Sequence, residues 1–194
     1  LERTKGSSLP RTQFQKLDSS NTNKVFDPPP IFQNNELTSH SKFYRLCLRR
    51  RLNPNQERTL IPCIIPPGWS HVHSLISCSF KTSADLLWAC GLTLSLPIDF
   101  KYRSSAKVDF LAPDFKDLLS IKKPENLQIL DMVCSRVLLL SCVTNQHKSL
   151  WEDNWSTKDF KWIGQRNNFK EYVFINSWTQ EWNSETRLLS DLGR

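Results

Sequence analysis

Two histidines separated by a single valine, His71 and His73, have the spacing in this chain that comes nearest to a metal site. On a β-strand, alternate side chains leave from the same face, so both imidazoles could face one zinc or iron ion. Such a site needs a third ligand. Cys78 falls on the opposite alternation, and Asp85 does not stand at a suitable spacing either. We therefore interpret the pair as polar residues at the start of a strand and predict no metal site.

Residues that could form a catalytic centre are equally scarce. The chain has no G-x-S-x-G turn and no Walker loop, and its five glycines leave little room for a nucleotide cradle. The stretch DPPP at residues 27–30 is comparable with the Asp/Asn-Pro-Pro-aromatic loop of amino-methyltransferases, but its fourth residue, Pro30, cannot stack on a flipped base. We interpret this stretch as a linker, and predict no catalytic residue and no cofactor in this chain.

Basic residues outnumber acidic ones and indicate a polyanionic partner. The formal net charge is +7 and the isoelectric point is about 9.2. This balance favours nucleic acid first and an anionic membrane surface second, although a solvated basic surface without a partner has the same composition. The longest apolar-rich run, residues 127–143, contains Asp131 and Arg136 and is too short to span a membrane, so we expect no membrane partner.

The cationic residues fall into two groups along the chain. One group lies on a predicted strand, in the turn after it and at the start of the next strand, and the second group follows further along. Arginine forks suit phosphates and guanine edges, asparagine suits adenine edges, and histidine can contact phosphate. The candidate DNA-binding residues are Arg45, Arg49, Arg50, Arg51, Asn53, Asn55, Arg58, His71, His73, Lys101, Arg103 and Lys107.

A structural role is the alternative for each of these arginines. Arg45 or Arg58 could be the ion-pair partner of Glu57 or Asp99. Arginine occurs both in ion pairs and on binding surfaces, so both interpretations stay open for each arginine taken alone. The set as a whole favours a binding surface.

Alternation with a period of two predicts three short strands. Residues 42–50 alternate between an apolar face and an arginine-bearing face, and residues 58–66 and 71–80 follow as further strands after proline-containing turns. Prolines 62 and 66 favour a sheet edge or a bulge for the second strand. The three strands are predicted to form a meander.

Helical patterns follow these strands. One helix is predicted from an N-cap at Ser83, residues 98–113 return to alternation and predict a strand or extended loop, and the clearest helix has Pro124 as its first residue. The tryptophan-rich remainder is predicted to be helical with irregular connections. The predicted fold class is α+β: a short mixed or antiparallel β-meander with packed helices, followed by a helical C-terminal segment.

Three regions follow from these patterns: a polar linker or irregular segment over residues 1–41, an α+β region over 42–122, and a helical, tryptophan-rich segment over 123–194. The six cysteines form no C-x-x-C pair, and several lie in apolar runs, which indicates reduced thiols in the cytoplasm. The first residues lack the apolar core of a signal peptide. Because the chain starts with leucine and stops within a predicted helix, we expect a piece of a longer protein.

From Phe43 onward the sequence resembles the target-recognition region of large adenine-specific DNA methyltransferases of bacterial restriction-modification and phage-defence systems, namely type IIG-like enzymes and DISARM-like relatives. The stretch ERTLIPCIIPPG at residues 57–68 carries the resemblance most specifically. An arginine-bearing strand precedes it. LLWACGLTLSLPIDFKYRSSAKVDF at residues 86–110 and the helical stretch at residues 127–155 follow it and are less specific.

The resemblance implies a DNA-sequence recognition module whose catalytic half lies elsewhere. The methyl-donor loop and the N-P-P-Y-type motif of such enzymes would stand upstream and are absent here, so S-adenosylmethionine is implied only for the parent enzyme. The implied partners are double-stranded DNA, the catalytic methyltransferase domain of the parent chain and other subunits of a defence system. The recognition role carries over at Arg45, Arg49, Glu57, Arg58 and Thr59, and at the IPPG turn.

Two further hypotheses belong to other classes of protein. The first is a protein-interaction or structural module of a multi-subunit phage-defence complex, because tryptophan is enriched at interface anchors. Ordinary core packing is the alternative that we favour for these tryptophans. The second is an enzyme with a metal at His71 and His73. The tryptophans in question are Trp151, Trp155, Trp162, Trp178 and Trp182.

Overall fold

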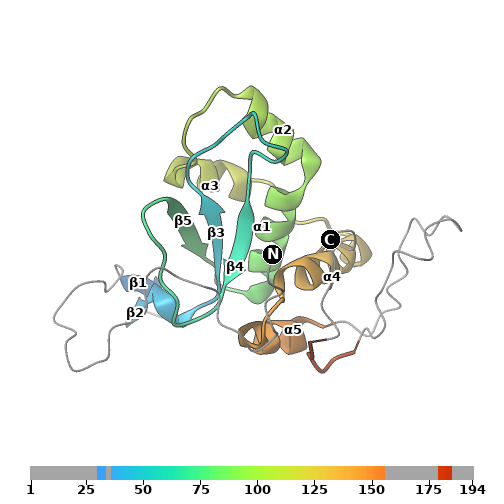
Figure 1. The fold of residues 1–194 in the computed structure, drawn as a ribbon. Helices are drawn as coiled ribbons and strands as arrows, with labels where there is room; N and C mark the ends of the chain where they lie inside the picture. The colour runs from blue at the N-terminus through green and yellow to red at the C-terminus, as the bar shows by residue number, and fades with distance from the viewer. Residues whose placement is uncertain (1–29, 34–35, 156–178, 185–194) are drawn as a thin grey trace, which may run out of the picture.

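The computed structural model describes residues 30–33, 36–155 and 179–184 (Figure 1). Within them, two sheets precede a group of helices. A two-stranded antiparallel sheet contains β1 (Pro30–Gln33) and β2 (Glu36–Ser39), and a three-stranded antiparallel sheet contains β3 (Arg45–Arg49), β4 (Pro62–Ile65) and β5 (Leu75–Ser79). The helices are α1 (Ser83–Leu94), α2 (Leu96–Ser104), α3 (Ala112–Leu119), α4 (Leu127–Ser141) and α5 (Lys148–Asn154). The α+β prediction, with helices after an antiparallel sheet, is confirmed.

The strand order of the larger sheet differs from a simple meander. Its order is β4-β3-β5, so β3 lies in the middle and pairs with both of the strands that follow it. Pro62, the first residue of β4, removes one backbone donor, and such residues are tolerated on edge strands. After β4 the chain therefore crosses to the other edge of β3, where β5 pairs with β3. Figure 1 shows the three strands with β3 between its neighbours.

The part of residues 1–41 that the structure describes is more regular than an irregular linker. Residues 30–33 and 36–39 pair as β1 and β2, and a short 3-10 helix, His40–Lys42, leads into β3. Residues 1–29, which include most of the predicted linker, lie outside the described residues.

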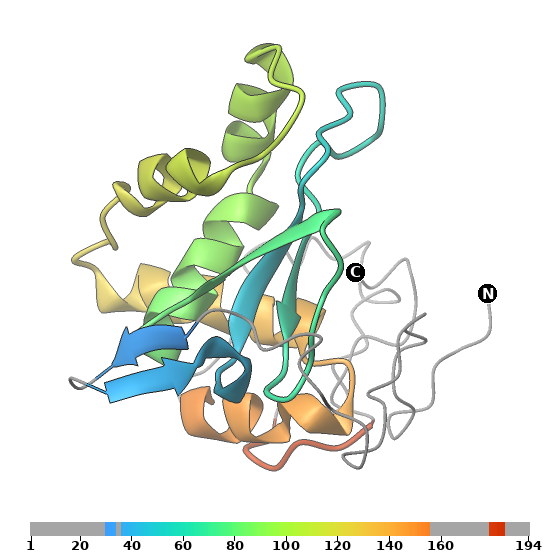
Figure 2. The ribbon, with the colours of Figure 1, turned by 90° about the vertical axis from the view of Figure 1, so that its left-hand side faces the viewer.

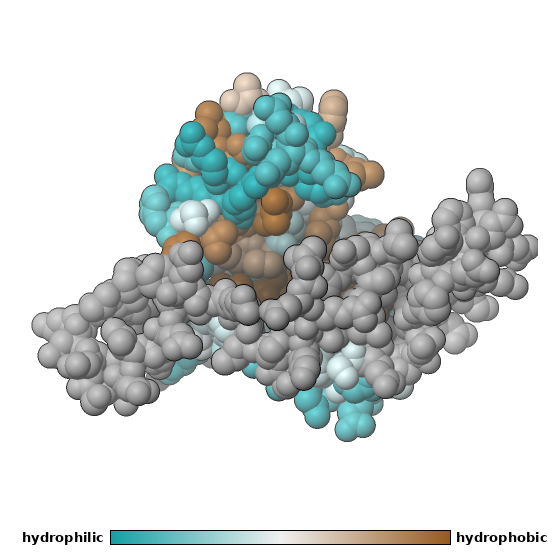
Figure 3. Space-filling view, in the orientation of Figure 1, coloured by the Kyte–Doolittle hydropathy of each residue, from teal (hydrophilic) through white to brown (hydrophobic). Residues whose placement is uncertain are grey.

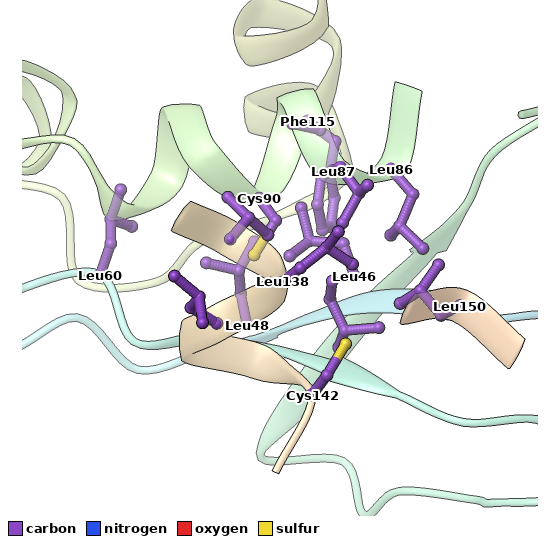
Figure 4. Close-up of a cluster of buried hydrophobic side chains, with 14 of the residues drawn as sticks. Leu46, Leu48, Leu60, Leu86, Leu87, Cys90, Phe115, Leu138, Cys142 and Leu150 are labelled. Atoms are coloured by element: carbon purple, nitrogen blue, oxygen red, sulfur yellow. The ribbon is translucent and has the colours of Figure 1, made fainter. Parts of the chain in front are cut away.

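The core forms where alternate residues of the sheet meet α1 and α4. Leu46 and Leu48 of β3 are 0% and 1% exposed and pack with Leu87 of α1 and Leu138 of α4 (Figure 4). Gly91 lets α1 and α4 approach closely, because a Cβ at this position would collide with the side chain of Val133. Helices α1 and α4 thus pack against each other, and both contribute side chains to the core beside the sheet.

Helix boundaries differ from the sequence predictions in three places. Residues 98–104, part of the stretch 98–113 that was predicted as a strand or extended loop, belong to α2, in which proline stands at the first turn and Ser95 precedes it as N-cap. Thr82, not Ser83, caps α1, and its hydroxyl accepts a bond from the backbone N–H of Asp85 at 3.1 Å. Asn126 caps α4 in the same way through Gln128, so Pro124 lies before the helix.

The described tryptophans of the last region belong to the core. Trp151 is 0% exposed and Trp182 is 8% exposed, and both pack in the same hydrophobic cluster as the sheet. The indole N–H of Trp182 donates to the carbonyl of Cys142 at 2.9 Å. Core packing is confirmed for these two residues. Trp162, Trp178 and the predicted helical segments over 156–178 and 185–194 lie outside the described residues.

His147 joins this helical part to the sheet through a neutral imidazole. It is 5% exposed, and its Nε2 lies 3.0 Å from the carbonyl oxygen of Ile64 in β4. A carbonyl only accepts, so Nε2 carries the proton and Nδ1 accepts from the Thr144 hydroxyl, 3.0 Å away. Burial lowers the pKa of His147 below its ordinary value of 6.5, against hydrogen bonds to the backbone of Ile64 and Thr144, which raise it.

We predict that the free energy of unfolding decreases as the pH falls from about 7 to about 5. The unfolded chain takes up a proton on His147 near pH 6.5, whereas the buried imidazole resists it, so stability is complete above that pH and is lost below it. The slope contributed by this residue approaches about 1.4 kcal/mol per pH unit. Urea unfolding at a series of pH values measures the slope. His147→Gln, which keeps an N–H donor but does not titrate, should have a shallower slope, and an unchanged slope in this variant would refute the assignment.

Candidate functional site

The two groups of basic residues, well separated in the sequence, meet at one end of the molecule. The backbone N–H of Leu52 donates to the carbonyl of Val108 at 2.8 Å, and that of Phe110 donates to the carbonyl of Arg50 at 2.7 Å. Arg51 and Asp109 form an antiparallel β-bridge between these bonds. The segment after α2 is thereby fixed beside the loop between β3 and β4. We call this region, residues 49–61 and 96–109, the cationic end (top of Figures 1 and 2).

Asp99 of α2 holds the loop in place. It is 4% exposed, and its Oδ1 accepts bonds from the backbone N–H groups of Thr59 at 2.9 Å and Leu60 at 2.8 Å. Two guanidinium groups balance its charge: Nε of Arg58 lies 3.4 Å from Oδ1, and Nη2 of Arg103 lies 3.7 Å from Oδ2. A buried carboxylate needs such partners, because a charge removed from water is costly unless it is paired and hydrogen-bonded.

The structural alternative therefore applies to Arg58 and Arg103. Arg58 also donates to the carbonyl of Leu94 at 2.8 Å, and Arg103 donates to the carbonyls of Gln56 and Glu57 at 2.7 and 2.5 Å. Both guanidinium groups are thus engaged in holding the β3–β4 loop against α1 and α2. The ion pair between Arg58 and Asp99 is the pairing that the sequence left open for Arg58.

The two lysines of the second basic group also face carboxylates. Lys101 Nζ lies 2.5 Å from Asp117 Oδ2, in a pair exposed on both sides. Lys107 bonds to Asp114, whose side chain is 4% exposed and also accepts from the backbone N–H of Leu111. Asp114 thereby begins α3, so Lys107 has a structural partner, whereas the Lys101 pair is open to water and salt.

Three consecutive arginines remain at the surface of the loop. Arg51 is the most exposed, with 74% of its side chain accessible and Asp109 at 3.7 Å. Arg50 lies 3.9 Å from the same carboxylate and contacts His73 Nε2 at 2.5 Å. Arg49 donates to the side-chain oxygen of Gln56 at 2.5 Å, and its Nε and Nη2 are buried without a hydrogen-bond partner among the described residues. Arg51, and to a smaller extent Arg50, are therefore the arginines of this loop that solvent reaches.

The two asparagines of the loop have different environments. Asn53 is half-buried and accepts a bond from the backbone N–H of Asn55 through its side chain at 3.0 Å, which is an Asx turn. Asn55 is exposed at the tip of the loop. Asn53 thus shapes the turn, and Asn55 presents its amide to solvent.

Arg45 is not on an exposed face, contrary to the sequence analysis. It is 1% exposed, and its guanidinium contacts His40 Nδ1 at 2.8 Å and bonds to the carbonyl of Trp69. Because arginine only donates, His40 Nδ1 is unprotonated; burial first and the charge of Arg45 second lower the pKa of His40. The region that buries Arg45 includes the IPPG turn, where Gly68 has a φ of +83° and its N–H bonds to Ser41.

His71 and His73 do not converge on a common point. His71 Nε2 lies 2.8 Å from the Ser77 hydroxyl, whereas His73 faces Arg50 at the cationic end. Both residues precede β5, which begins at Leu75, so strand alternation does not apply to them. No group of three or more His, Cys, Asp or Glu residues that could hold a metal occurs in the described part of the chain.

Phe100 and Leu96 are surface residues that the sequence analysis did not single out. They lie one turn apart on α2 and are 68% and 71% exposed, beside Lys101 and Arg103. Reading residues 96–104 as a helix would have found them, because positions i and i+4 share a face. In Figure 3 the same end of the molecule presents mainly hydrophilic residues interrupted by hydrophobic ones.

A hollow of about 450 Å³ adjoins this end, between the start of β5 and the start of α3. Arg50 and His73 form its polar wall, and the remaining wall is apolar. The apolar residues are Leu75, Ile76, Leu111, Ala112 and Pro113.

Comparisons with known protein families, curated proteins and solved structures find no match to this chain. Among the helices of the described residues, none has the length and apolar character required to cross a membrane.

We predict that Asp99→Ala lowers the free energy of unfolding by about 3 kcal/mol, because it leaves two buried backbone N–H groups and two cations without their acceptor. Asp117→Ala is the matched control, since it removes a carboxylate from an ion pair that is exposed on both sides. Urea unfolding of both variants measures the difference. Equal effects of the two substitutions would show that Asp99 does not hold the loop.

Proposed function

We propose that this chain is a DNA-recognition module and that the cationic end is its contact surface. The observation that carries the proposal is the meeting of two distant basic segments at one place, through the backbone bonds between residues 50–52 and 108–110. Phosphate contacts from arginine and lysine supply most of the affinity of DNA-binding proteins. A surface assembled from two segments can follow a duplex backbone better than one isolated charged loop.

The ion pairs distinguish basic residues that hold the structure from basic residues that are available to contact DNA. Arg58 and Arg103 hold the loop through Asp99, and Lys107 holds the start of α3 through Asp114. Contact with phosphate then falls to Arg50 and Arg51, whose side chains are 30% and 74% exposed, and to Lys101, whose exposed ion pair with Asp117 is weak in water. Such residues can exchange a surface carboxylate for a phosphate without unfolding the loop.

Two residues beside these arginines could add information on the bases. Asn55 presents an amide at the loop tip, and an asparagine amide can pair with an adenine edge in the major groove. Phe100 is an exposed aromatic ring on α2, and aromatic rings stack on unpaired bases. We assign sequence reading to Asn55, stacking that does not depend on base identity to Phe100, and affinity to the arginines.

The resemblance over residues 57–68 supports a place for this module in an adenine-specific DNA methyltransferase of a bacterial defence system. In that arrangement the parent's catalytic domain binds S-adenosylmethionine and transfers the methyl group, in the cytoplasm, while this chain selects the site. The IPPG turn of the resembling stretch bonds to Ser41 through Gly68, and Trp69, which follows it, accepts a bond from the buried Arg45, so the turn belongs to the scaffold.

An interaction module of a multi-subunit defence complex is the second candidate. The exposed apolar side chains of Leu96 and Phe100 favour it, because apolar residues at the surface mark contact sites for protein. The tryptophans give it less support, since Trp151 and Trp182 are in the core.

We predict that the chain binds a fluorescently labelled mixed-sequence duplex, and that the affinity falls steeply between about 50 mM and about 200 mM salt as counterions return to the phosphates. Arg51→Ala should weaken binding and reduce the slope of log affinity against log salt by about 1. Fluorescence anisotropy at several salt concentrations measures both quantities.

Lys148→Ala is the matched control, because it removes the same charge from α5 at the opposite end of the molecule, where Lys148 faces Glu152 at 3.6 Å. This variant should bind like the wild type. Absence of binding at low salt would overturn the proposal, and so would an equal loss in both variants.

A further inference from the structure

Cys47 and Cys63 stand directly opposite each other on the two neighbouring strands β3 and β4. The backbone N–H of Arg49 donates to the carbonyl of Ile61 at 3.2 Å, so residues 49 and 61 are a hydrogen-bonded pair, and the alternation of antiparallel pairs makes 47 and 63 another. The Cα atoms of such a pair are about 5.5 Å apart. Disulfides join Cα atoms about 4.4–6.8 Å apart.

Both side chains leave from the face of the sheet that is turned away from α1. The neighbours Leu46 and Ile64 point into the core, so residues 47 and 63 share the other face. The two cysteines differ in access: Cys47 is fully buried, whereas Cys63 is exposed. A reagent in solution can therefore reach the thiol of Cys63 but not that of Cys47.

The surroundings favour the thiolate at the exposed position. A hydrogen bond from the Cys47 thiol lowers the pKa of Cys63, and the same bond raises the pKa of Cys47. Arg45 and Arg49 flank Cys47 on the same side of β3, and the charge of Arg45 lowers the pKa of Cys47 against that rise. Cys63 is the accessible thiol of the pair, and Cys47 stands opposite it in the position of a resolving partner.

We propose that Cys47 and Cys63 form a reversible cross-strand dithiol–disulfide site that is oxidised by peroxide. The Cys63 thiolate attacks one peroxide oxygen, the O–O bond breaks, and with one proton taken up the products are Cys63 sulfenic acid and water. The Cys47 sulfur then attacks the Cys63 sulfur, the S–O bond breaks, and the hydroxyl leaves as water with the Cys47 proton. The peroxide is reduced by two electrons, which the two thiols supply. An external thiol reverses the bond by exchange.

The other thiols of the described residues lack this combination. Cys90 and Cys142 are 1% and 0% exposed in the core, and burial raises the pKa of Cys90 to about 12. Cys78 is opposite Leu46 in the sheet, so it has no cysteine facing it across the strands. The site is independent of the proposed DNA function, because it needs only β3 and β4.

The test treats the reduced full chain with hydrogen peroxide, blocks the remaining thiols with N-ethylmaleimide and digests with trypsin. Cleavage at the arginines between residues 49 and 58 separates Cys47 from Cys63, so a bond between them joins peptide 46–49 to peptide 59–81. The second peptide also contains Cys78, and the Cys78→Ser variant removes that ambiguity. We expect the cross-linked pair, the loss of two free thiols, and full recovery with dithiothreitol, in both the wild type and Cys78→Ser.

Two variants test the assigned roles. Cys63→Ser should abolish the cross-link, and Cys47→Ala should leave Cys63 as a sulfenic acid that dimedone traps. Dimedone labelling of Cys63 in the wild type to the extent seen in Cys47→Ala would overturn the proposal. An unchanged thiol count in the wild type, at peroxide levels that oxidise glutathione, would overturn it as well.

Discussion

The buried carboxylate of Asp99 is the interaction on which the cationic end depends. The chain between β3 and β4 brings the backbone N–H groups of Thr59 and Leu60 out of water before β4 begins, and buried backbone donors need acceptors. Asp99 supplies one oxygen to both groups. Its charge in turn draws in Arg58 and Arg103, so a single side chain of α2 fixes the loop and orients two cations.

This arrangement separates cations that hold the structure from cations that remain available. Arg45, Arg58 and Arg103 have internal partners, whereas Arg50 and Arg51, which follow β3, are 30% and 74% exposed and lie near the carboxylate of Asp109. The loop that Asp99 positions is the loop that carries those arginines. A change at Asp99 would therefore move the proposed contact surface although Asp99 itself never reaches DNA.

Local patterns in the sequence predicted the elements better than their arrangement. Alternation located β3, and the apolar face from Leu86 onward located α1, because each depends on a few neighbouring residues. The order β4-β3-β5 depends on contacts between distant segments, which periodicity does not record. The alternation of residues 98–113 was misleading, because Asp99 and Tyr102 are buried with the three-residue spacing of a helix, whereas the apolar Phe100 between them is exposed.

For the candidate site as well, the sequence predicted the residues better than their arrangement. The sequence located the basic residues and offered Asp99 as a partner for one of them, but residue types alone do not distinguish an arginine that serves a buried carboxylate from one that faces water. Arg45 was misplaced for a related reason: strand alternation assigned it to a polar face, but contacts with His40 and with the carbonyl of Trp69 bury it. Only tertiary contacts decide such cases.

Hydrogen–deuterium exchange of the full chain with and without duplex DNA at low salt tests the central claim most directly. If the two segments form one binding surface, DNA slows exchange at residues 49–61 and at residues 96–109 together, and leaves α4 and α5 unchanged. Protection confined to α4 and α5, or to only one of the two segments, would contradict the claim.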